Sequence, residues 1–309
     1  MSSFSGFSKD YKPALKFDLR QKDEGGDIKI PGRVDGKMDV FNRRECLVLV
    51  HGFNNHAGEA AASYQGFRAS ECDRYADLKP ENLEKLLGDT FWPGDAGWPG
   101  PLDWLDFMVY PAAVGTARSA GPELGHLIMK FPMLDRIHFL GHSLGCRVVL
   151  ETLDYLKKNS FPLSRVGGIC LMAAAVQADT LADNGRFADV LDSLGTAGAK
   201  ILVLHSAKDA VLHYTFGLGQ TAAGEGWFPM ALGRFGPPPN MRGIVFQETI
   251  EGAEHSDYWG RKDNAPSKAS TAAVGDFFKL SDKPREMKPR YFTAAREVAW
   301  CRDAAKNEW

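Results

Sequence analysis

The chain has few cysteines, and those it has are not arranged for pairing. Five of its 309 residues are cysteines, an odd number, and no two stand in a Cys-x-x-Cys pattern. Cys46, Cys146 and Cys170 fall in or beside apolar segments, which favours buried thiols over disulfides or a metal site. A chain without a disulfide framework suits a reducing compartment, so we expect a cytoplasmic location.

Charge of one sign and long apolar runs are also scarce. The formal net charge is −2 and like charges do not gather in blocks, so nucleic acid is not an expected partner. No apolar stretch reaches the roughly 20 residues that span a bilayer, and residues 1–10 lack the apolar core of a signal peptide. Integral membrane association is therefore not expected. With 44% hydrophobic and 25% charged residues, the composition is that of a globular domain.

Short apolar runs alternate with helical or irregular stretches, which is typical of a mostly parallel sheet covered on both faces. The sequence predicts one α/β domain over residues 1–309 with about eight strands. The expected strands are 14–20, 37–41, 45–50, 107–110, 136–140, 168–173, 200–204 and 244–249. The expected helices are 57–75, 81–87, 118–130, 146–158 and a closing helix at 291–307.

Two segments rich in glycine and aromatic residues, 88–104 and 211–243, do not fit this alternation. Long loops are uncommon in a compact domain and often functional. Two interpretations stay open here: the aromatic side chains fix long loops to the surface, or they form a cap over an apolar pocket. We predict cap segments, and whether 211–243 moves as a lid is left open.

The most informative motif is Gly141-His142-Ser143-Leu144-Gly145. It follows an apolar strand and precedes a helix, and the sequence strand, G-x-S-x-G, helix is the nucleophile elbow. The two glycines permit a turn too sharp for side chains, and the strained serine then projects its hydroxyl beyond the carboxyl end of the sheet. Ser143 is therefore the predicted nucleophile.

A serine hydroxyl is a weak nucleophile at neutral pH and needs a histidine base that is oriented by a carboxylate. In folds with this elbow the chain order is serine, acid, histidine. Asp209 lies just past the strand at 200–204, and His255 lies in the loop after the strand at 244–249. The sequence therefore predicts the triad Ser143, Asp209 and His255.

Two other carboxylates stay open as the acid. Asp179 follows the strand that ends near residue 173, one strand earlier than Asp209, and Asp183 is a weaker version of the same alternative.

Acyl transfer also needs backbone N–H groups aimed at the developing oxyanion. Leu144, next to the nucleophile, is expected to supply one. Phe53 is expected to supply the other from the loop after the strand at 45–50, with Asn54 as the alternative donor. The residues expected to line the substrate pocket are Asn54, His142, His213, Trp92 and Trp227.

No metal or cofactor is expected. His138 and His142 are four residues apart, but they fall on a strand and a turn rather than on one face of a helix. They therefore do not form a zinc-binding pair.

Several segments of the chain resemble the α/β-hydrolase superfamily and, more narrowly, the uncharacterised bacterial group DUF900. The similar segments are Leu47–Asn55, Phe91-Trp92-Pro93-Gly94, Tyr110 with the helix from near Arg118, Ile137–Arg147, Ala173–Asp179, Leu204–Ala210 and His255–Tyr258. The resemblance spans roughly residues 45–260. It implies the α/β-hydrolase fold with an eight-stranded core, and a serine hydrolase mechanism carried by Ser143, Asp209 and His255. It implies no particular substrate.

Serine rather than aspartate at the elbow favours acyl chemistry over the epoxide and halide chemistry of the superfamily. We expect hydrolysis of carboxylic esters whose acyl or alcohol groups are moderately apolar. The expected binding partner is therefore a small-molecule acyl substrate. Two alternatives stay open: an amidase, peptidase or thioesterase with the same triad, and a non-catalytic module that binds a lipid or a protein. The oligomeric state is not predicted.

Overall fold

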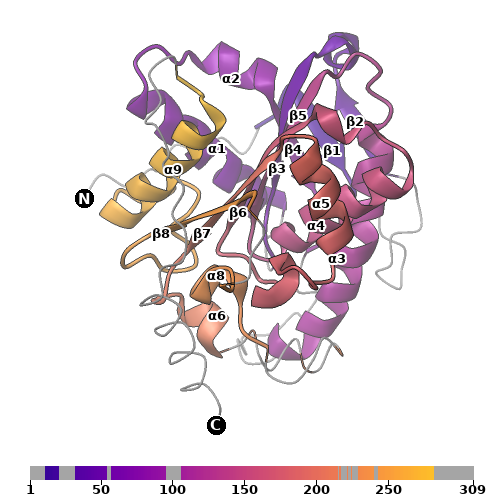
Figure 1. Ribbon diagram of the computed structural model, residues 1–309. Helices are drawn as coiled ribbons and strands as arrows, with labels where there is room; N and C mark the ends of the chain where they lie inside the picture. The colour runs from indigo at the N-terminus through magenta and orange to yellow at the C-terminus, as the bar shows by residue number, and fades with distance from the viewer. Residues whose placement is uncertain are drawn as a thin grey trace.

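An eight-stranded sheet forms the centre of the protein in the computed structural model, with the strand order β2-β1-β4-β3-β5-β6-β7-β8 (Figure 1). The structure describes residues 11–20, 32–53, 57–94, 106–214, 216, 221, 224, 229–239 and 243–281. The strands are β1 (Leu15–Asp18), β2 (Arg33–Gly36), β3 (Glu45–Val50), β4 (Leu87–Phe91), β5 (Arg136–His142), β6 (Val166–Met172), β7 (Lys200–His205) and β8 (Val245–Thr249). β2 pairs antiparallel with β1, and every other neighbouring pair of these strands is parallel.

Helices cover both faces of this sheet, as the apolar strands require. Figure 1 shows α1 (Ala57–Arg74), α2 (Pro80–Leu86) and α9 (Ala265–Phe278) on one face, and α3 (Asp106–Ile128), α4 (Gly145–Lys158) and α5 (Ala188–Thr196) on the other. Two short helices, α6 (Ala210–Tyr214) and α8 (Leu232–Phe235), lie near the end of β7. Short 3₁₀ turns are η1 (Met38–Asn42), η3 (Leu163–Arg165) and η4 (Ala178–Leu181). Strands β3 and β5–β7 are buried almost throughout, which explains their continuous apolar sequences.

The sheet, its parallel pairing and its two helical layers confirm the α/β-hydrolase fold expected from the sequence. Two of the expected strands are wrong. Residues 37–41 lie largely in η1, where only Val40 is buried. Residues 107–110 belong to α3, which continues through Pro111. A short apolar run before a proline is typical of a strand end, but such a run cannot be told from a buried helix by periodicity alone.

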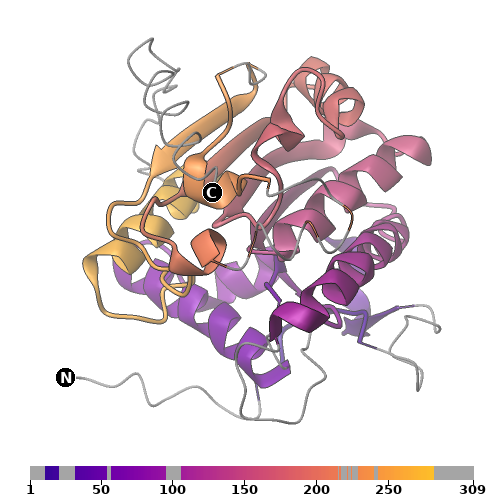
Figure 2. The ribbon, with the colours of Figure 1, turned by 90° about the horizontal axis from the view of Figure 1, so that it is seen from below.

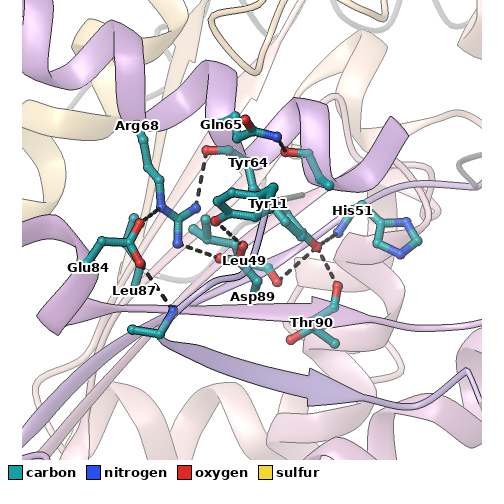
Figure 3. Close-up of polar contacts among 12 residues, drawn as sticks. Tyr11, Leu49, His51, Tyr64, Gln65, Arg68, Glu84, Leu87, Asp89 and Thr90 are labelled. Atoms are coloured by element: carbon teal, nitrogen blue, oxygen red, sulfur yellow. Dashed lines mark hydrogen bonds and ion pairs between the residues drawn. The ribbon is translucent and has the colours of Figure 1, made fainter. Parts of the chain in front are cut away.

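The predicted cap segment at 88–104 is also partly wrong, because residues 88–91 belong to the buried strand β4. Gly88 and Asp89 are residue types that strands disfavour, so the sequence pattern indicated a loop. Asp89 is nevertheless fully buried, and its carboxylate accepts hydrogen bonds from Arg68 at 2.9 Å and Tyr11 at 2.7 Å (Figure 3). A partner from α1 thus makes a charged residue acceptable inside the sheet.

Helix α9 was not expected, although its start carries a recognisable signal. Asn264 caps the helix by accepting a hydrogen bond from the Ser267 N–H at 2.8 Å, and a proline follows in the first turn. The closing helix expected at 291–307 lies outside the described residues.

Cys46, Cys146 and Cys170 are buried free thiols, as the sequence predicted. In the described part of the chain, no helix combines the length and apolarity that crossing a membrane requires. The cytoplasmic location stays a prediction.

The interface between α1 and α9 encloses an unusual carboxyl group. Glu71 is fully buried and packs against Gly275, and neither of its carboxyl oxygens has a hydrogen-bond partner among the described residues. Burial raises the pKa of Glu71 well above its ordinary value; Arg74 opposes this rise and Asp276 adds to it. The Glu71 carboxyl group of the folded protein is therefore uncharged over a range of pH in which the same group is already ionised in the unfolded chain.

We expect Glu71→Gln to remove part of the pH dependence of stability. Because the folded-state pKa lies above the unfolded value near 4.5, folding binds a proton above that pH, so stability falls as pH rises through the window between the two values. For one proton the loss approaches about 1.4 kcal/mol per pH unit. Denaturant unfolding at several pH values above 4.5 measures it, with the exposed Glu81→Gln as control. Parallel pH profiles for the wild type and Glu71→Gln would contradict the assignment.

Candidate active site

Three loops that follow parallel strands meet at one edge of the sheet. Ser143 follows β5, Asp209 follows β7 and His255 follows β8. These three strands lie in the same half of the sheet: β6 stands between β5 and β7, and β8 is next to β7. Figure 2 looks onto this edge, where α6 and α8 lie in front of the strands. The topology therefore collects residues that are up to 112 positions apart in the chain.

The turn at Ser143 has the strained geometry that its glycines predicted. Ser143 has a φ of +53°, in the left-handed region that non-glycine residues seldom adopt. A side chain at Gly145 would overlap the carbonyl oxygens of Val50 and His51, and one at Gly141 would lie 3.0 Å from the Cys146 Cα. Both glycines are thus required by close backbone contacts on either side of the turn.

Hydrogen bonds connect the three predicted triad residues. The Asp209 Oδ2 atom lies 2.7 Å from His255 Nδ1, and His255 Nε2 lies 2.8 Å from Ser143 Oγ. A neutral imidazole with its proton on Nδ1 donates to the carboxylate and accepts from the hydroxyl. Ser143 and Asp209 are 6% and 0% exposed, so this chain of bonds is shielded from solvent.

Asp209 is held by a second bond that leaves one oxygen for His255. It precedes α6, and its Oδ1 atom accepts a hydrogen bond from the Leu212 N–H at 2.9 Å, as a residue at a helix N-terminus does. The alternative acids lie elsewhere: Asp179 is exposed on η4, and Asp183 is exposed in the loop beyond it. The structure therefore brings only Asp209, of these three, into contact with His255.

The loop that carries His255 is shaped by a carboxylate two residues further on. Asp257 Oδ2 accepts from the Glu254 N–H at 2.8 Å, and Asp257 Oδ1 pairs with Lys262 at 2.8 Å and accepts from Asn264 at 3.1 Å. Burial alone would raise the pKa of Asp257, but these bonds outweigh burial and lower it. The sequence reasoning missed this residue.

His142 was predicted to line the pocket, and the structure places it beside the loop of His255. Its Nε2 atom donates a hydrogen bond of 2.8 Å to the His255 carbonyl oxygen. Burial, and after it the neighbouring His255, lowers the pKa of His142 to about 3, so the ring is neutral at neutral pH. His142 thus links the end of β5, which carries Ser143, to the loop of His255.

The two predicted oxyanion donors lie on segments in contact with Ser143. A Cβ atom on Gly52 would lie 2.8 Å from the Ser143 Cβ atom, which shows how closely the loop before Phe53 approaches the serine. Leu144 is buried at the start of α4, where helix N–H groups are not yet used within the helix.

His51, at the start of this loop, is fixed by four polar contacts. Its N–H donates to the Tyr64 hydroxyl at 2.9 Å (Figure 3), and its carbonyl accepts from the Trp92 indole at 2.7 Å. Its ring Nδ1 donates to the Gly52 carbonyl at 2.8 Å, and Nε2 lies 3.5 Å from Arg20. Burial, and after it the charge of Arg20, lowers the pKa of His51 to about 3, so the ring stays neutral.

Aromatic contacts join this loop to the loop of His255. Trp92, predicted to line the pocket, is instead fully buried and stacks on the His51 ring at a centroid distance of 5.6 Å. Tyr64, which receives the His51 N–H, meets Trp259 edge-on at 5.4 Å. Trp259 follows His255 by four residues, so the loops of His255 and of Phe53 both contact Tyr64 of α1.

The other predicted pocket residues are only partly described. His213 is half-buried on α6, where burial and the charge of Arg234 lower its pKa. Asn54 and Trp227 lie outside the described residues, as does most of the segment at 217–228.

A family model described as "Alpha/beta hydrolase of unknown function (DUF900)" matches residues 34–223, which is more than half of the chain. The chain belongs to this family. The match includes the strands that carry the elbow and Asp209 of this hydrolase, while His255 lies beyond its end. A comparison with curated proteins gave no match.

Solved structures resemble the hydrolase at low sequence identity. An uncharacterised protein from Bacillus cereus shares 12% identity over 81% of this chain with a TM-score of 0.42, and the match spans 64% of that protein. An esterase from Pyrobaculum calidifontis shares 11% identity over 75% of each chain with a TM-score of 0.41. A carboxylesterase from Bacillus subtilis shares 11% over 76% of this chain and 83% of its own, with a TM-score of 0.37.

Proposed function

We propose that this hydrolase cleaves carboxylic esters through an acyl-enzyme intermediate. His255 Nε2 takes the proton of Ser143 as the serine oxygen attacks the ester carbonyl carbon, and then gives that proton to the departing alcohol. Water, deprotonated by the same nitrogen, attacks the acyl-serine carbonyl; His255 then returns the proton to the Ser143 oxygen as the carboxylic acid leaves. Asp209 holds the imidazole in the required tautomer and stabilises its charged form.

In this proposal the oxyanion is bound by the backbone N–H groups of Phe53 and Leu144. The close approach of Gly52 to the Ser143 Cβ atom supports the first assignment, since Phe53 is the next residue in that loop. The start of α4 supports the second, because a helix N-terminus favours negative charge.

The observation that carries the proposal is the hydrogen-bond chain from Asp209 through His255 to Ser143, with distances of 2.7 and 2.8 Å. A serine in a strained turn with a base and an oriented carboxylate is an activated nucleophile. Membership of a hydrolase family supports the same class of reaction. The preference for moderately apolar esters over amides and thioesters belongs to the proposal.

Labelling with a fluorophosphonate probe tests the activated nucleophile. We expect labelling of the folded wild type at Ser143 only, read by peptide mass, with no labelling of Ser143→Ala or of heat-denatured protein. Ser193→Ala is the matched control, since Ser193 lies on α5 and bonds the Asp189 carbonyl. An unlabelled wild type would contradict the proposal and favour a binding module. Matched ester, amide and thioester substrates then separate the acyl classes.

We expect His142→Leu to lower kcat about fivefold, and His142→Gln to restore most of the loss. Leucine removes the bond to the His255 carbonyl, whereas the glutamine amide can still donate to it; a bond of this kind contributes about 1 kcal/mol. Steady-state kinetics with an ester substrate measure the effect, which should appear in kcat more than in KM. Equal losses in both variants would assign His142 a packing role alone.

A further inference from the structure

Part of the segment predicted as a cap is bound firmly to the body of the protein. The Leu232 N–H donates a hydrogen bond to the Val176 carbonyl at 2.8 Å, and the Gly233 N–H donates to the Ala174 carbonyl at 2.9 Å. A Cβ atom on Gly233 would overlap the Ala174 nitrogen, so the two backbones lie in close contact. Residues 232–234, called the anchored segment below, are therefore fixed to the loop that follows β6.

The anchored segment also connects the loops of Ser143 and Asp209. In the loop after β6, the Ala175 N–H donates to the Ser143 carbonyl at 3.1 Å. In the loop after β7, the Ser206 N–H donates to the Gly233 carbonyl at 3.0 Å. The segment is thus bound on one side to a loop that holds the turn of Ser143, and on the other to the loop that leads to Asp209.

Arg234, the last residue of the anchored segment, donates to the backbone of Asp209. Its Nη1 atom lies 3.2 Å from the Asp209 carbonyl oxygen, which also accepts from the His213 N–H at 3.1 Å. The bond from His213 belongs to α6, a helix of five residues, and a helix this short needs contacts with the rest of the protein to be stable. Helix α8, which carries Arg234, packs against α6 (Figure 2). The charge-assisted bond from Arg234 therefore stabilises the first turn of α6.

The side chain of Asp209 depends on the position of this turn. Its Oδ1 atom accepts from the Leu212 N–H at 2.9 Å, and its Oδ2 atom lies 2.7 Å from His255 Nδ1. A shift of α6 would move both oxygens together and lengthen the bond to His255. A displacement of about 1 Å in a catalytic group can cost about a hundredfold in rate, so a contact that fixes α6 has a kinetic consequence.

We propose that Arg234 is a positioning residue for the triad: it holds Asp209 against His255 by binding the Asp209 carbonyl from the anchored segment. Residues 232–234 are then a fixed part of the site and do not move as a lid. The guanidinium takes no part in proton transfer. The inference rests on the proposed function, because the orientation of Asp209 matters to catalysis only if the triad is active.

Arg234→Met removes the donor and the charge and keeps an apolar side chain. We expect kcat for a p-nitrophenyl ester to fall about tenfold with KM little changed, because a hydrogen bond from a charged group is lost. Arg234→Lys should recover most of the loss, since its ammonium group can donate to the same carbonyl. Arg44→Met is the matched control and should keep wild-type kinetics, because Arg44 precedes β3 at the opposite end of the strands and pairs with exposed Asp135.

A wild-type kcat in Arg234→Met, or a loss confined to KM, would overturn the proposal. An equal loss of kcat in Arg234→Lys would assign the effect to packing of the side chain and would overturn it too.

A double-mutant cycle with Asp209→Asn separates positioning from an independent role. In the Asp209→Asn protein, the added Arg234→Met substitution should lower kcat less than twofold, because the residue that Arg234 positions no longer orients His255. The rate of Ser143→Ala is subtracted as the background. A further tenfold loss in the Asp209→Asn protein would show that Arg234 acts without Asp209, and the proposal would fail.

Amide hydrogen exchange measures the contact without any substrate. The amides of Leu212 and His213 should exchange severalfold faster in Arg234→Met, while those of α4 keep their wild-type rates. If the fluorophosphonate probe does not label the wild type, the proposed function fails, and the exchange of α6 still tests whether Arg234 holds this turn. If labelling succeeds and the exchange of α6 is unchanged in Arg234→Met, only the inference about Arg234 fails.

Discussion

Ser143→Ala is expected to lower kcat/KM for ester hydrolysis by about ten-thousand- to a million-fold, the usual cost of removing a serine nucleophile. Alanine keeps the Cβ atom, so the strained backbone at φ +53° and the packing against Gly52 are unchanged. The loss therefore falls on chemistry and not on folding. Steady-state hydrolysis of p-nitrophenyl esters of graded chain length measures it, with thermal unfolding of both proteins alongside.

Two results would contradict this expectation. Activity within tenfold of the wild type, in protein shown to be free of contaminating esterase, would exclude Ser143 as the nucleophile. A large fall in unfolding temperature would assign the loss of activity to damage of the fold.

Asp209→Asn is expected to lower kcat by about ten-thousand-fold with little effect on substrate binding. The asparagine carbonyl still accepts from the Leu212 N–H, which leaves its NH₂ group facing His255 Nδ1. The ring then needs its lone pair on Nδ1 and its proton on Nε2, and Nε2 can no longer accept the proton of Ser143. The fold is preserved because size and the bond to Leu212 are kept.

Asp179→Asn is the matched comparison for this variant. Asp179 is the alternative acid from the sequence and is exposed on η4, so its replacement should leave kcat unchanged. The reverse ranking of the two variants would exclude Asp209 as the orienting acid.

The site was more predictable than the fold around it, for a physical reason. The elbow is a local pattern in the sequence: Gly141 and Gly145 flank Ser143 within five residues, although Gly145 is required by contact with the Val50 and His51 carbonyls. A parallel sheet then delivers Asp209 and His255 to the same edge. Residue type, strand ends and chain order therefore sufficed to name the three side chains that the structure joins by hydrogen bonds.

What the sequence did not reveal depends on partners far away in the chain. β4 was mistaken for a loop because Asp89 is acceptable in a strand only beside Arg68 and Tyr11. Trp92 was predicted to line the pocket because nothing local indicates that its indole bonds the His51 carbonyl. Asp257 was missed because its role is to fix a loop shape, which no spacing encodes.

Helices α1 and α9, which enclose Glu71, each follow a loop of the candidate active site. Phe53 precedes α1 in the sequence, the loop of His255 precedes α9, and these helices pack together, with Trp259 in edge-on contact with Tyr64. We therefore expect His255 and the proposed oxyanion donor Phe53 to belong to one cooperative unit that opens as a whole. On heating, loss of activity should coincide with the onset of amide exchange in α1 and α9, even while the strands at the centre of the sheet are still protected.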